Sequence, residues 1–150
     1  MRSFLVLLAS LASPLLVQAQ DSILTRLQAA KSLKYEFPIG VLGNWDTKGP
    51  NIERGTKGMS LHFDGIDLSA KHARLIGNQG AGDVMAIFNM ASINIFETTG
   101  LSNVNYTTVF ASYQPGTDHF VAVTSRHLSL GIPGPIPIPS QWYGTCRVWE

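Results

Sequence analysis

From Lys34 onward, glycine, proline and other turn-forming residues interrupt the chain every few positions. The segments between them are rich in Val, Ile, Thr, Tyr and Phe, or alternate apolar with polar side chains. Between Met59 and Phe63, for example, apolar side chains alternate with Ser60 and His62, as in a strand with one buried face. The segments between these turn-forming residues are too short for long helices, so we expect short strands joined by tight turns.

This pattern predicts eight strands and one helix. The expected strands cover residues 36–45, 58–63, 73–76, 83–88, 91–98, 104–114, 119–126 and 141–149. Asp21 or Ser22 can cap a short helix whose apolar spacing continues to Leu33. No segment is long enough for a helical crossover between parallel strands, so we expect an all-β, mainly antiparallel fold. An eight-stranded lipocalin-like β-barrel is favoured, and a two-sheet sandwich is the alternative.

Prolines occupy alternate positions from Pro133 to Pro139. Proline has no backbone N–H to donate to a β-ladder, so we expect residues 131–139 to form an extended loop or lid. A polyproline ligand for a partner protein is the alternative, although this spacing differs from the usual PxxP pattern.

The N-terminus has the features of a secretory signal peptide. A positive start, an apolar run over residues 4–17 and small residues at the two cleavage-determining positions predict removal of residues 1–19. A membrane anchor is the competing interpretation, but the run is short for crossing a bilayer and contains Pro14. We expect a secreted or secretory-lumen protein with a single barrel domain over residues 20–150, in which 20–34 form a helical lead-in.

The expected mature chain has no formal net charge. The whole chain carries 11 Lys+Arg and 10 Asp+Glu, a net charge of +1, and Arg2 is the one charged residue that the signal peptide removes. Nucleic acids and anionic membranes attract clustered Lys and Arg, which are scattered here. No segment after the signal peptide approaches the length of a membrane span. We therefore expect neither nucleic-acid binding nor stable membrane insertion; the oligomeric state stays open.

Cys146 is the single cysteine, so no disulfide can form within the chain even in an oxidising compartment. About 130 residues can bury enough apolar surface to fold without such a link. We expect Cys146 to be a small buried side chain; a nucleophile or an intermolecular bridge is the alternative.

Asn105 begins the only N-glycosylation sequon, Asn105-Tyr106-Thr107. The sequon lies within an expected strand, and it can be used only where its side chain is exposed. Glycosylation at Asn105 is therefore a prediction that depends on which way the strand faces.

Familiar metal and cofactor motifs are missing from the sequence. The four histidines, His62, His72, His119 and His127, form no H-x-x-x-H or H-E-x-x-H spacing, and there is no CxxC. The sequence also lacks G-x-S-x-G, a Walker loop and a Rossmann fingerprint, and no helix with a lysine follows the glycine-rich run 77–82. We expect no metal and no cofactor.

Ionisable side chains within apolar strands are the best candidates for chemistry. Arg126 and His127 are adjacent on one strand and point to opposite sides, so one of them faces the interior. A buried Arg126 needs a carboxylate, which Glu97 or Asp83 can supply. The result is either an ion pair that fixes strand register or a site that binds or polarises a ligand oxygen.

Glu97 follows Ile93 and Ile95 on one side of a strand. If that side is interior, burial favours the neutral form and suits Glu97 to general-acid work, whereas a nearby Arg126 would keep it ionised as a base. The candidate catalytic residues are Glu97, Arg126, His127 and Asp83. The candidate ligand-binding residues are Tyr106, Tyr113 and Tyr143, whose hydroxyls need partners when buried, together with Trp142.

Two resemblances add to these expectations. Gly43-Asn44-Trp45 resembles the G-x-W opening of lipocalin-type barrels, which implies that Trp45 closes the barrel base. The blocks 73–80, 107–110, 121–127 and 140–146, the last two ending in SRH and YGTC, resemble a family of small secreted fungal proteins over about residues 60–149.

The fungal resemblance implies a compartment and, by analogy, a class of activity. Some small barrels of similar size act in fungal secondary-metabolite pathways without cofactors, as cyclases, isomerases or epoxide-opening hydrolases on polyketides or terpenoids. We therefore expect a secreted barrel that binds a small apolar molecule and opens an epoxide or closes a ring on a polyketide-like substrate. The alternative is a non-catalytic secreted binding protein or effector that contacts a host or cell-surface partner.

Overall fold

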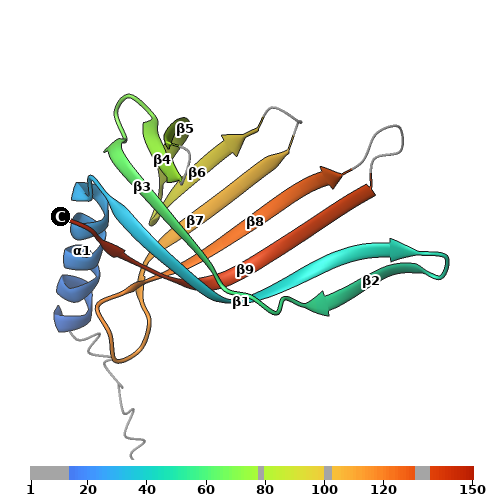
Figure 1. Cartoon of the computed structure of the whole chain (residues 1–150). Helices are drawn as coiled ribbons and strands as arrows, with labels where there is room; N and C mark the ends of the chain where they lie inside the picture. The colour runs from blue at the N-terminus through green and yellow to red at the C-terminus, as the bar shows by residue number, and fades with distance from the viewer. Residues whose placement is uncertain (1–13, 78–79, 100–102, 131–135) are drawn as a thin grey trace, which may run out of the picture.

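A computed structural model describes residues 14–77, 80–99, 103–130 and 136–150. One helix, α1 (Pro14–Ala29), precedes all the strands of this part of the chain (Figure 1). The strands are β1 (Leu33–Asp46), β2 (Gly49–Arg54), β3 (Met59–Asp67), β4 (His72–Gly77), β5 (Gly80–Asn89), β6 (Ser92–Thr98), β7 (Val104–Tyr113), β8 (Phe120–Leu130) and β9 (Ile136–Val148).

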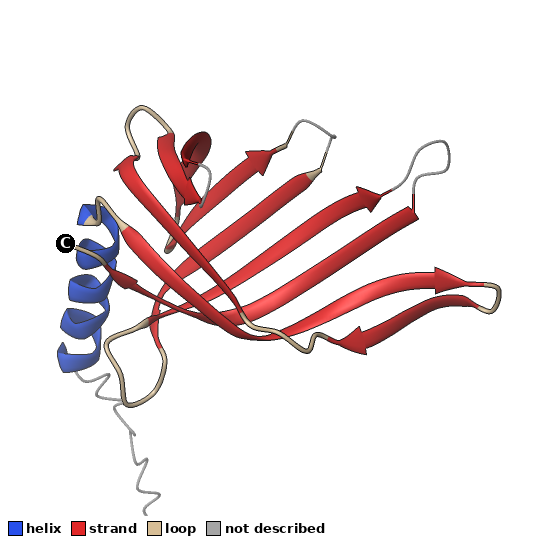
Figure 2. Ribbon diagram, in the orientation of Figure 1, coloured by secondary structure: helices blue, strands red, loops and turns tan. Residues whose placement is uncertain are grey.

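The strands form a closed antiparallel barrel (Figure 2). Each strand from β3 to β9 pairs with its neighbour in sequence, β1 pairs with β3, and β9 returns to pair with β1. Eight strands, β1 and β3 to β9, therefore close the ring, and β2 pairs only with the distal half of β1. The predicted all-β, lipocalin-like barrel is confirmed.

Strand β2 was not expected from the sequence. It forms a hairpin with β1 in which Trp45 pairs with Pro50 and Asp46 with Gly49. Nearly all of its side chains are exposed, so it has none of the apolar alternation that identifies a half-buried strand. Proline is compatible with this position because β2 is an edge strand.

The expectation of a loop over residues 131–139 is wrong for residues 136–139. Strand β9 begins at Ile136, where Pro137 pairs with Ser129 and Pro139 with His127 of β8. Backbone N–H groups of alternate residues point to the same side of a strand, so both prolines can direct their missing donor away from β8. No interstrand hydrogen bonds are lost on that side, because β1 pairs with β9 only from Ser140 onward. Residues 131–135 lie outside the described residues.

The helix is displaced toward the N-terminus relative to its expected bounds. It begins at Pro14, crosses the expected cleavage point after Ala19 and ends at Ala29. The expected end at Leu33 is wrong, because Leu33 is fully buried and pairs with Phe63 and Val148 as the first residue of β1. No helix in the described ranges is both long and apolar enough to cross a membrane.

Helix α1 lies across one end of the barrel, beside the start of β1 and the end of β9 (Figure 1). Leu27 is buried there, and Arg26 fixes the helix to the turn between β7 and β8. The Arg26 guanidinium donates to the Tyr113 hydroxyl at 2.9 Å and to the Asp118 carboxylate at 3.2 Å. This end of the barrel is therefore closed by the helix.

Trp45 does not close the barrel base. It lies in the β1–β2 hairpin and 54% of its surface is exposed. After Leu42, β1 has no further pairing with β9 and continues with β2 alone, which carries Trp45 away from the interior. The closing role that the lipocalin resemblance implies for this tryptophan is taken by α1.

The core occupies the α1 end of the barrel. The rings of Tyr35 and Phe63 meet edge to face with their centroids 5.5 Å apart. The register partner of Tyr35 on β9 is Cys146. Cys146 is only 2% exposed, so the expected buried side chain is confirmed. Burial raises the pKa of the Cys146 thiol, and burial together with the adjacent thiol raises the pKa of the Tyr35 hydroxyl.

Candidate functional site

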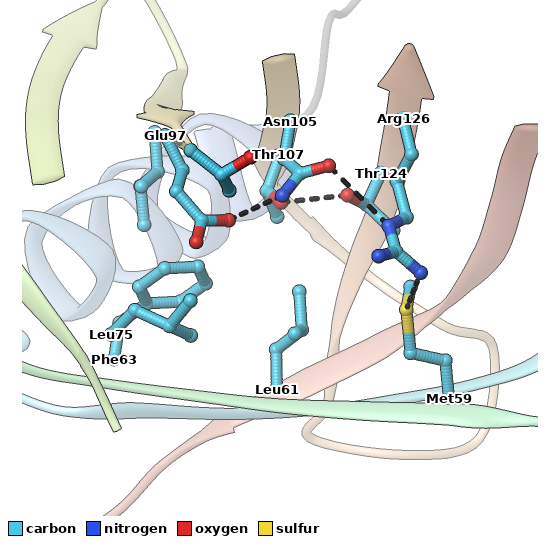
Figure 3. A pocket seen from close by; sticks show the side chains of 11 residues that line it. Met59, Leu61, Phe63, Leu75, Glu97, Asn105, Thr107, Thr124 and Arg126 are labelled. Atoms are coloured by element: carbon cyan, nitrogen blue, oxygen red, sulfur yellow. Dashed lines mark hydrogen bonds between the residues drawn. The ribbon is translucent and has the colours of Figure 1, made fainter. Parts of the chain in front are cut away.

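A cavity of about 210 Å³ lies inside the barrel, toward the end opposite α1 (Figure 3). It is bordered by side chains of β3, β4, β6, β7 and β8 and of the residue that follows β6. The lining residues are Met59, Leu61, Phe63, Leu75, Ile95, Glu97, Thr99, Asn105, Thr107, Thr124 and Arg126. A volume of this size can hold a small organic molecule, as in other small barrels.

The cavity has one apolar and one polar wall (Figure 3). Strands β3 and β4 contribute only apolar side chains, from Met59 to Leu75, whereas β6, β7 and β8 contribute the polar ones. The polar wall arises from the strand register, in which Glu97 is opposite Asn105 and Asn105 is opposite Arg126. Three inward positions on three adjacent strands therefore form a single row, which we call the polar row.

Asn105 connects the two charged members of the polar row. Its side-chain nitrogen Nδ2 donates a hydrogen bond to Oε2 of Glu97, and its Oδ1 accepts one from Nε of Arg126 at 3.3 Å. Arg126 Nη1 also lies 3.7 Å from the Met59 sulfur. Among the described residues, no ion pair joins Glu97 and Arg126 directly. The Asn105 amide lies between the two charged groups and forms a hydrogen bond with each of them.

Part of the hydrogen-bonding capacity of the polar row is unused within the described part of the chain. Glu97 Oε1 accepts no hydrogen bond there, and Arg126 Nη2 donates none. A carboxylate oxygen is an acceptor and a guanidinium nitrogen a donor. The cavity can therefore offer one acceptor and one charged donor to a bound molecule.

A buried pair of threonines lies next to the polar row, toward α1. Thr107 Oγ1 donates to Thr124 Oγ1 at 2.8 Å, and the two residues are register partners on β7 and β8. Each is two residues from a member of the polar row on its own strand, so its side chain points to the same side. The interior thus changes from charged, through hydroxyl-bearing, to apolar as it approaches the helix.

The structure resolves which neighbour on β8 faces inward. Arg126 lines the cavity, whereas His127 lines a separate groove on the outside, beside Ser125 and Gln141. Asp83 is also excluded from the cavity, because Val84 and Ala86 are the buried members of β5. The Asp83 side chain is 82% exposed and lies 3.1 Å from His72 Nε2. Of the four candidate catalytic residues, the structure brings together Glu97 and Arg126.

The four candidate ligand-binding aromatics lie elsewhere. Tyr106 and Tyr143 point outward, and their hydroxyls donate to Asn94 at 2.8 Å and to Gln141 at 2.6 Å, respectively. Tyr113 lies at the α1 end, bound to Arg26. These three tyrosines therefore have partners within the protein, remote from the cavity.

Trp142 is buried in the barrel wall region formed by β1 and β9. A Cβ added at Gly40 would lie 2.3 Å from its ring, so the glycine on β1 makes the space that the indole fills. Its Nε1 has no hydrogen-bond partner among the described residues. Trp142 is not among the residues that line the cavity, and its role here is packing.

Asn105 was singled out from the sequence for a different reason. Its Nδ2, the atom to which an N-glycan is attached, faces Glu97 in the cavity. A glycan at this position would have to occupy the cavity or displace the amide from the polar row. Glycosylation stays a prediction, and the structure gives Asn105 a second role that the sequon did not indicate.

The sequence also left Thr107, Thr124 and Met59 unassigned. A local signal existed for the threonines, because each lies two residues from Asn105 or Arg126. Their convergence depends on the pairing of β6, β7 and β8, which is not a local property. Among the described residues, no group of three His, Cys, Asp or Glu side chains could hold a metal ion.

The fold and the cavity define a class: a closed antiparallel β-barrel of lipocalin-like shape with an interior site of mixed polarity. No family model matches the chain, and no match was found among curated proteins or solved structures. The resemblance to small secreted fungal proteins therefore stays a prediction, and function has to be argued from the cavity.

Proposed function

We propose that the chain binds a small, mainly apolar molecule with at least one polar oxygen in the barrel cavity. The observation that carries this proposal is the juxtaposition of an apolar wall with the polar row Glu97-Asn105-Arg126. The signal-peptide features support a protein that acts after secretion, and the sequence resemblance supports a fungal source. A neutral mature chain with scattered basic residues suits an uncharged ligand better than a polyanion.

The two walls would contribute differently to binding. Burial of the ligand against Leu61, Phe63 and Leu75 would supply most of the affinity, at roughly 25 cal/mol per Å² of apolar surface. The free acceptor on Glu97 and the free donor on Arg126 would orient the ligand, with a hydroxyl toward the carboxylate and a carbonyl or ether oxygen toward the guanidinium.

The same geometry favours catalysis as a second function. Glu97 and Arg126 face one cavity, and epoxide opening needs a proton acceptor and a group that stabilises a developing oxyanion. Glu97 would take a proton from water as the water oxygen bonds to an epoxide carbon and the C–O bond of the ring breaks. Arg126 would stabilise the resulting alkoxide, which takes a proton back and regenerates the carboxylate. The products balance as epoxide plus water giving a diol, with no cofactor.

Binding can be tested with 2-naphthol and naphthalene, two fluorescent probes that differ by one hydroxyl. Leu61→Trp should fill the cavity and abolish binding of both probes. Glu97→Gln should remove most of the preference for 2-naphthol, about fivefold to tenfold, because a charged acceptor gives a stronger hydrogen bond than an amide. The control Asp83→Asn, on the outside, should bind both probes as the wild type does. Unchanged binding in a folded Leu61→Trp variant would refute the cavity as the binding site.

Catalysis has a separate readout. Conversion of styrene oxide to its diol by the wild type, lost in Glu97→Gln while 2-naphthol still binds, would establish the enzymatic function. Equal turnover in Glu97→Gln and wild type would exclude Glu97 as the base. Probe binding without any turnover, over a panel of aryl and alkyl epoxides, would support the non-catalytic binding protein.

A further inference from the structure

The threonine pair of the cavity has one hydroxyl hydrogen more than its hydrogen bond uses. Thr107 Oγ1 donates to Thr124 Oγ1 at 2.8 Å, and neither hydroxyl has another hydrogen-bond partner within the described residues (Figure 3). A threonine hydroxyl carries one hydrogen and can accept as well as donate. Two hydroxyls joined by a single bond therefore keep one hydrogen without an acceptor, whichever of them is the donor.

This free donor is buried. Thr124 is 0% exposed and Thr107 is 2% exposed, and both side chains line the cavity. A buried donor without an acceptor is destabilising, so the large majority of such groups in folded proteins have a partner. The free hydrogen of the threonine pair therefore indicates an acceptor that a bound molecule supplies.

Among the described residues, the neighbours of the threonine pair do not supply that acceptor. In the register of the sheet, the pair lies between Ile95 on β6 and Trp142 on β9. The isoleucine side chain has no polar atom, and the indole N–H is a donor only. Toward α1, the next interior residues of β7 and β8 are the buried Val109 and Ala122. The polar row, on the other side, forms no hydrogen bond with either threonine, which leaves a molecule in the cavity as the source of the acceptor.

The threonine pair and the polar row are two polar levels of one cavity. Thr107 follows Asn105 by two residues on β7, and Thr124 precedes Arg126 by two residues on β8. Two residues of a strand span about 7 Å. A molecule that satisfies both levels needs polar atoms at about this separation. The atoms between them should be apolar, because they lie against the wall formed by β3 and β4.

We infer that the cavity selects a molecule with two oxygen functions at opposite ends of a small apolar ring. A hydroxyl at one end donates to Glu97 or accepts from Arg126, and a carbonyl or ether oxygen at the other end accepts the free hydrogen of the threonine pair. A single six-membered ring with para substituents matches the separation of the two levels and fits a cavity of about 210 Å³. This inference rests on the proposed function, because it specifies which molecules the cavity binds. Thr107 and Thr124 are then specificity-determining residues.

Two phenols that differ only at the far end of the ring test this inference. 4-Hydroxyacetophenone carries a ketone oxygen where 4-isopropylphenol carries a methyl group. NMR titration of the full chain at pH 6, where both phenols are neutral, gives the affinity of the ketone relative to that of the isopropyl compound. This ratio should fall about threefold to tenfold in Thr107→Val combined with Thr124→Val, because the ketone loses one hydrogen bond between neutral groups. Comparing ratios between variants cancels the difference in hydrophobicity between the two compounds.

Thr108→Val is the matched control, because Thr108 lies on the outer side of β7 and donates to Asn94 at 3.1 Å. It should keep the wild-type ratio. Both compounds should lose binding in a folded Leu61→Trp variant, which assigns their binding to the cavity. The double variant should fold, since it removes both hydroxyls of the buried pair together and leaves neither without a partner.

The orientation of the ketone gives a second readout in the wild type. Nuclear Overhauser effects should join its acetyl methyl group to the methyl groups of Ile95 and Thr124. They should be absent to Met59, which lies beside Arg126 at the level of the polar row. An unchanged ratio in the folded double variant, or an acetyl group beside Met59, would overturn the inference and leave binding in the cavity intact. Failure of both compounds and of 2-naphthol to bind the wild type would overturn the proposed function as well.

Discussion

Arg126 Nε donates a hydrogen bond of 3.3 Å to Asn105 Oδ1, and the two residues are direct partners in the register of β7 and β8. The same amide donates to Glu97 on the other side. Asn105 thus lies between the two charged groups of the cavity and forms a hydrogen bond with each. The amide is neutral, so replacing it with a charged side chain should change the electrostatic interactions of Glu97 and Arg126.

We expect Asn105→Asp to reduce the free energy of unfolding by about 1–3 kcal/mol. The introduced carboxylate would pair with Arg126, but Glu97 would lose the hydrogen bond from Asn105 Nδ2 and gain a like charge beside it. Urea denaturation at pH 7 measures the loss. Asn94→Asp, on the outer side of β6, adds the same charge away from the cavity and should cost less; equal losses in both variants would contradict a specific contact with Glu97.

We expect Thr124→Val to reduce the free energy of unfolding by about 1–3 kcal/mol, because Thr107 would then keep a buried hydroxyl without its acceptor. The double change Thr107→Val with Thr124→Val should recover much of that loss, since apolar groups of the same shape replace both partners. Urea denaturation of the double-mutant cycle measures the coupling. Strictly additive effects would show that the two hydroxyls act independently.

We expect Gly144→Ala to destabilise the barrel by more than about 2 kcal/mol, because overpacking a closed interior displaces backbone. A Cβ at this position of β9 would lie 1.9 Å from the carbonyl oxygen of Glu36 on β1, where the barrel closes. Gly82→Ala is the matched control, since nothing lies within 4 Å of its added Cβ. Thermal unfolding should show a large loss in the first variant and a small change or gain in the second.

We expect the link between Arg26 and Asp118 to stabilise the fold only above acid pH. The hydrogen bond from Arg26 holds the pKa of Asp118 below its usual value. The pKa of Asp118 is about 3.9 in the unfolded chain and lower in the folded protein. The ion pair therefore stabilises the folded protein fully above the unfolded pKa, and this stabilisation is lost as pH falls through the folded pKa. The Tm difference between wild type and Asp118→Asn should therefore shrink from pH 6 to pH 3. It should be small throughout, because the Asp118 side chain is 68% exposed and the Arg26 side chain 39% exposed, so water screens the pair.

The control for this pH series is Glu150→Gln at the exposed C-terminus, which changes the net charge equally. A Tm difference for Asp118→Asn that stays constant down to pH 2, or that matches the control at every pH, would show that the Arg26 contact has no role in attaching α1 to the β7–β8 turn.

We expect Cys146 to be inert toward thiol reagents in the folded protein. Its raised pKa reduces the thiolate fraction, and its burial denies access to the reagent. Ellman's reagent should react with one thiol per chain in denaturant and with almost none in native buffer at pH 8. Rapid native reaction would mean that the β1–β9 seam opens readily.

The local sequence was sufficient for the strands that have one buried face. Alternation over Met59–Phe63 identified the first part of β3, which continues to Asp67, and alternation from Ser92 identified β6. It also placed Glu97 on the side of Ile93 and Ile95, which proved to be the interior. Side-chain direction along a single strand depends on a period of two, which neighbouring residues alone encode. Where that period was absent, in β2, the strand was not identified.

The composition of the site depended on contacts between residues far apart in sequence. The choice of Arg126 over His127, the exclusion of Asp83 and the bridging role of Asn105 all follow from the register of β5 to β8 and the curvature that closes them. The pairing of Pro137 and Pro139 likewise required knowing that β1 leaves β9 at Ser140. The residues of one strand determine which of its side chains share a face. The hydrogen bonds between strands determine which residues of neighbouring strands lie opposite each other and which face becomes the interior of the barrel.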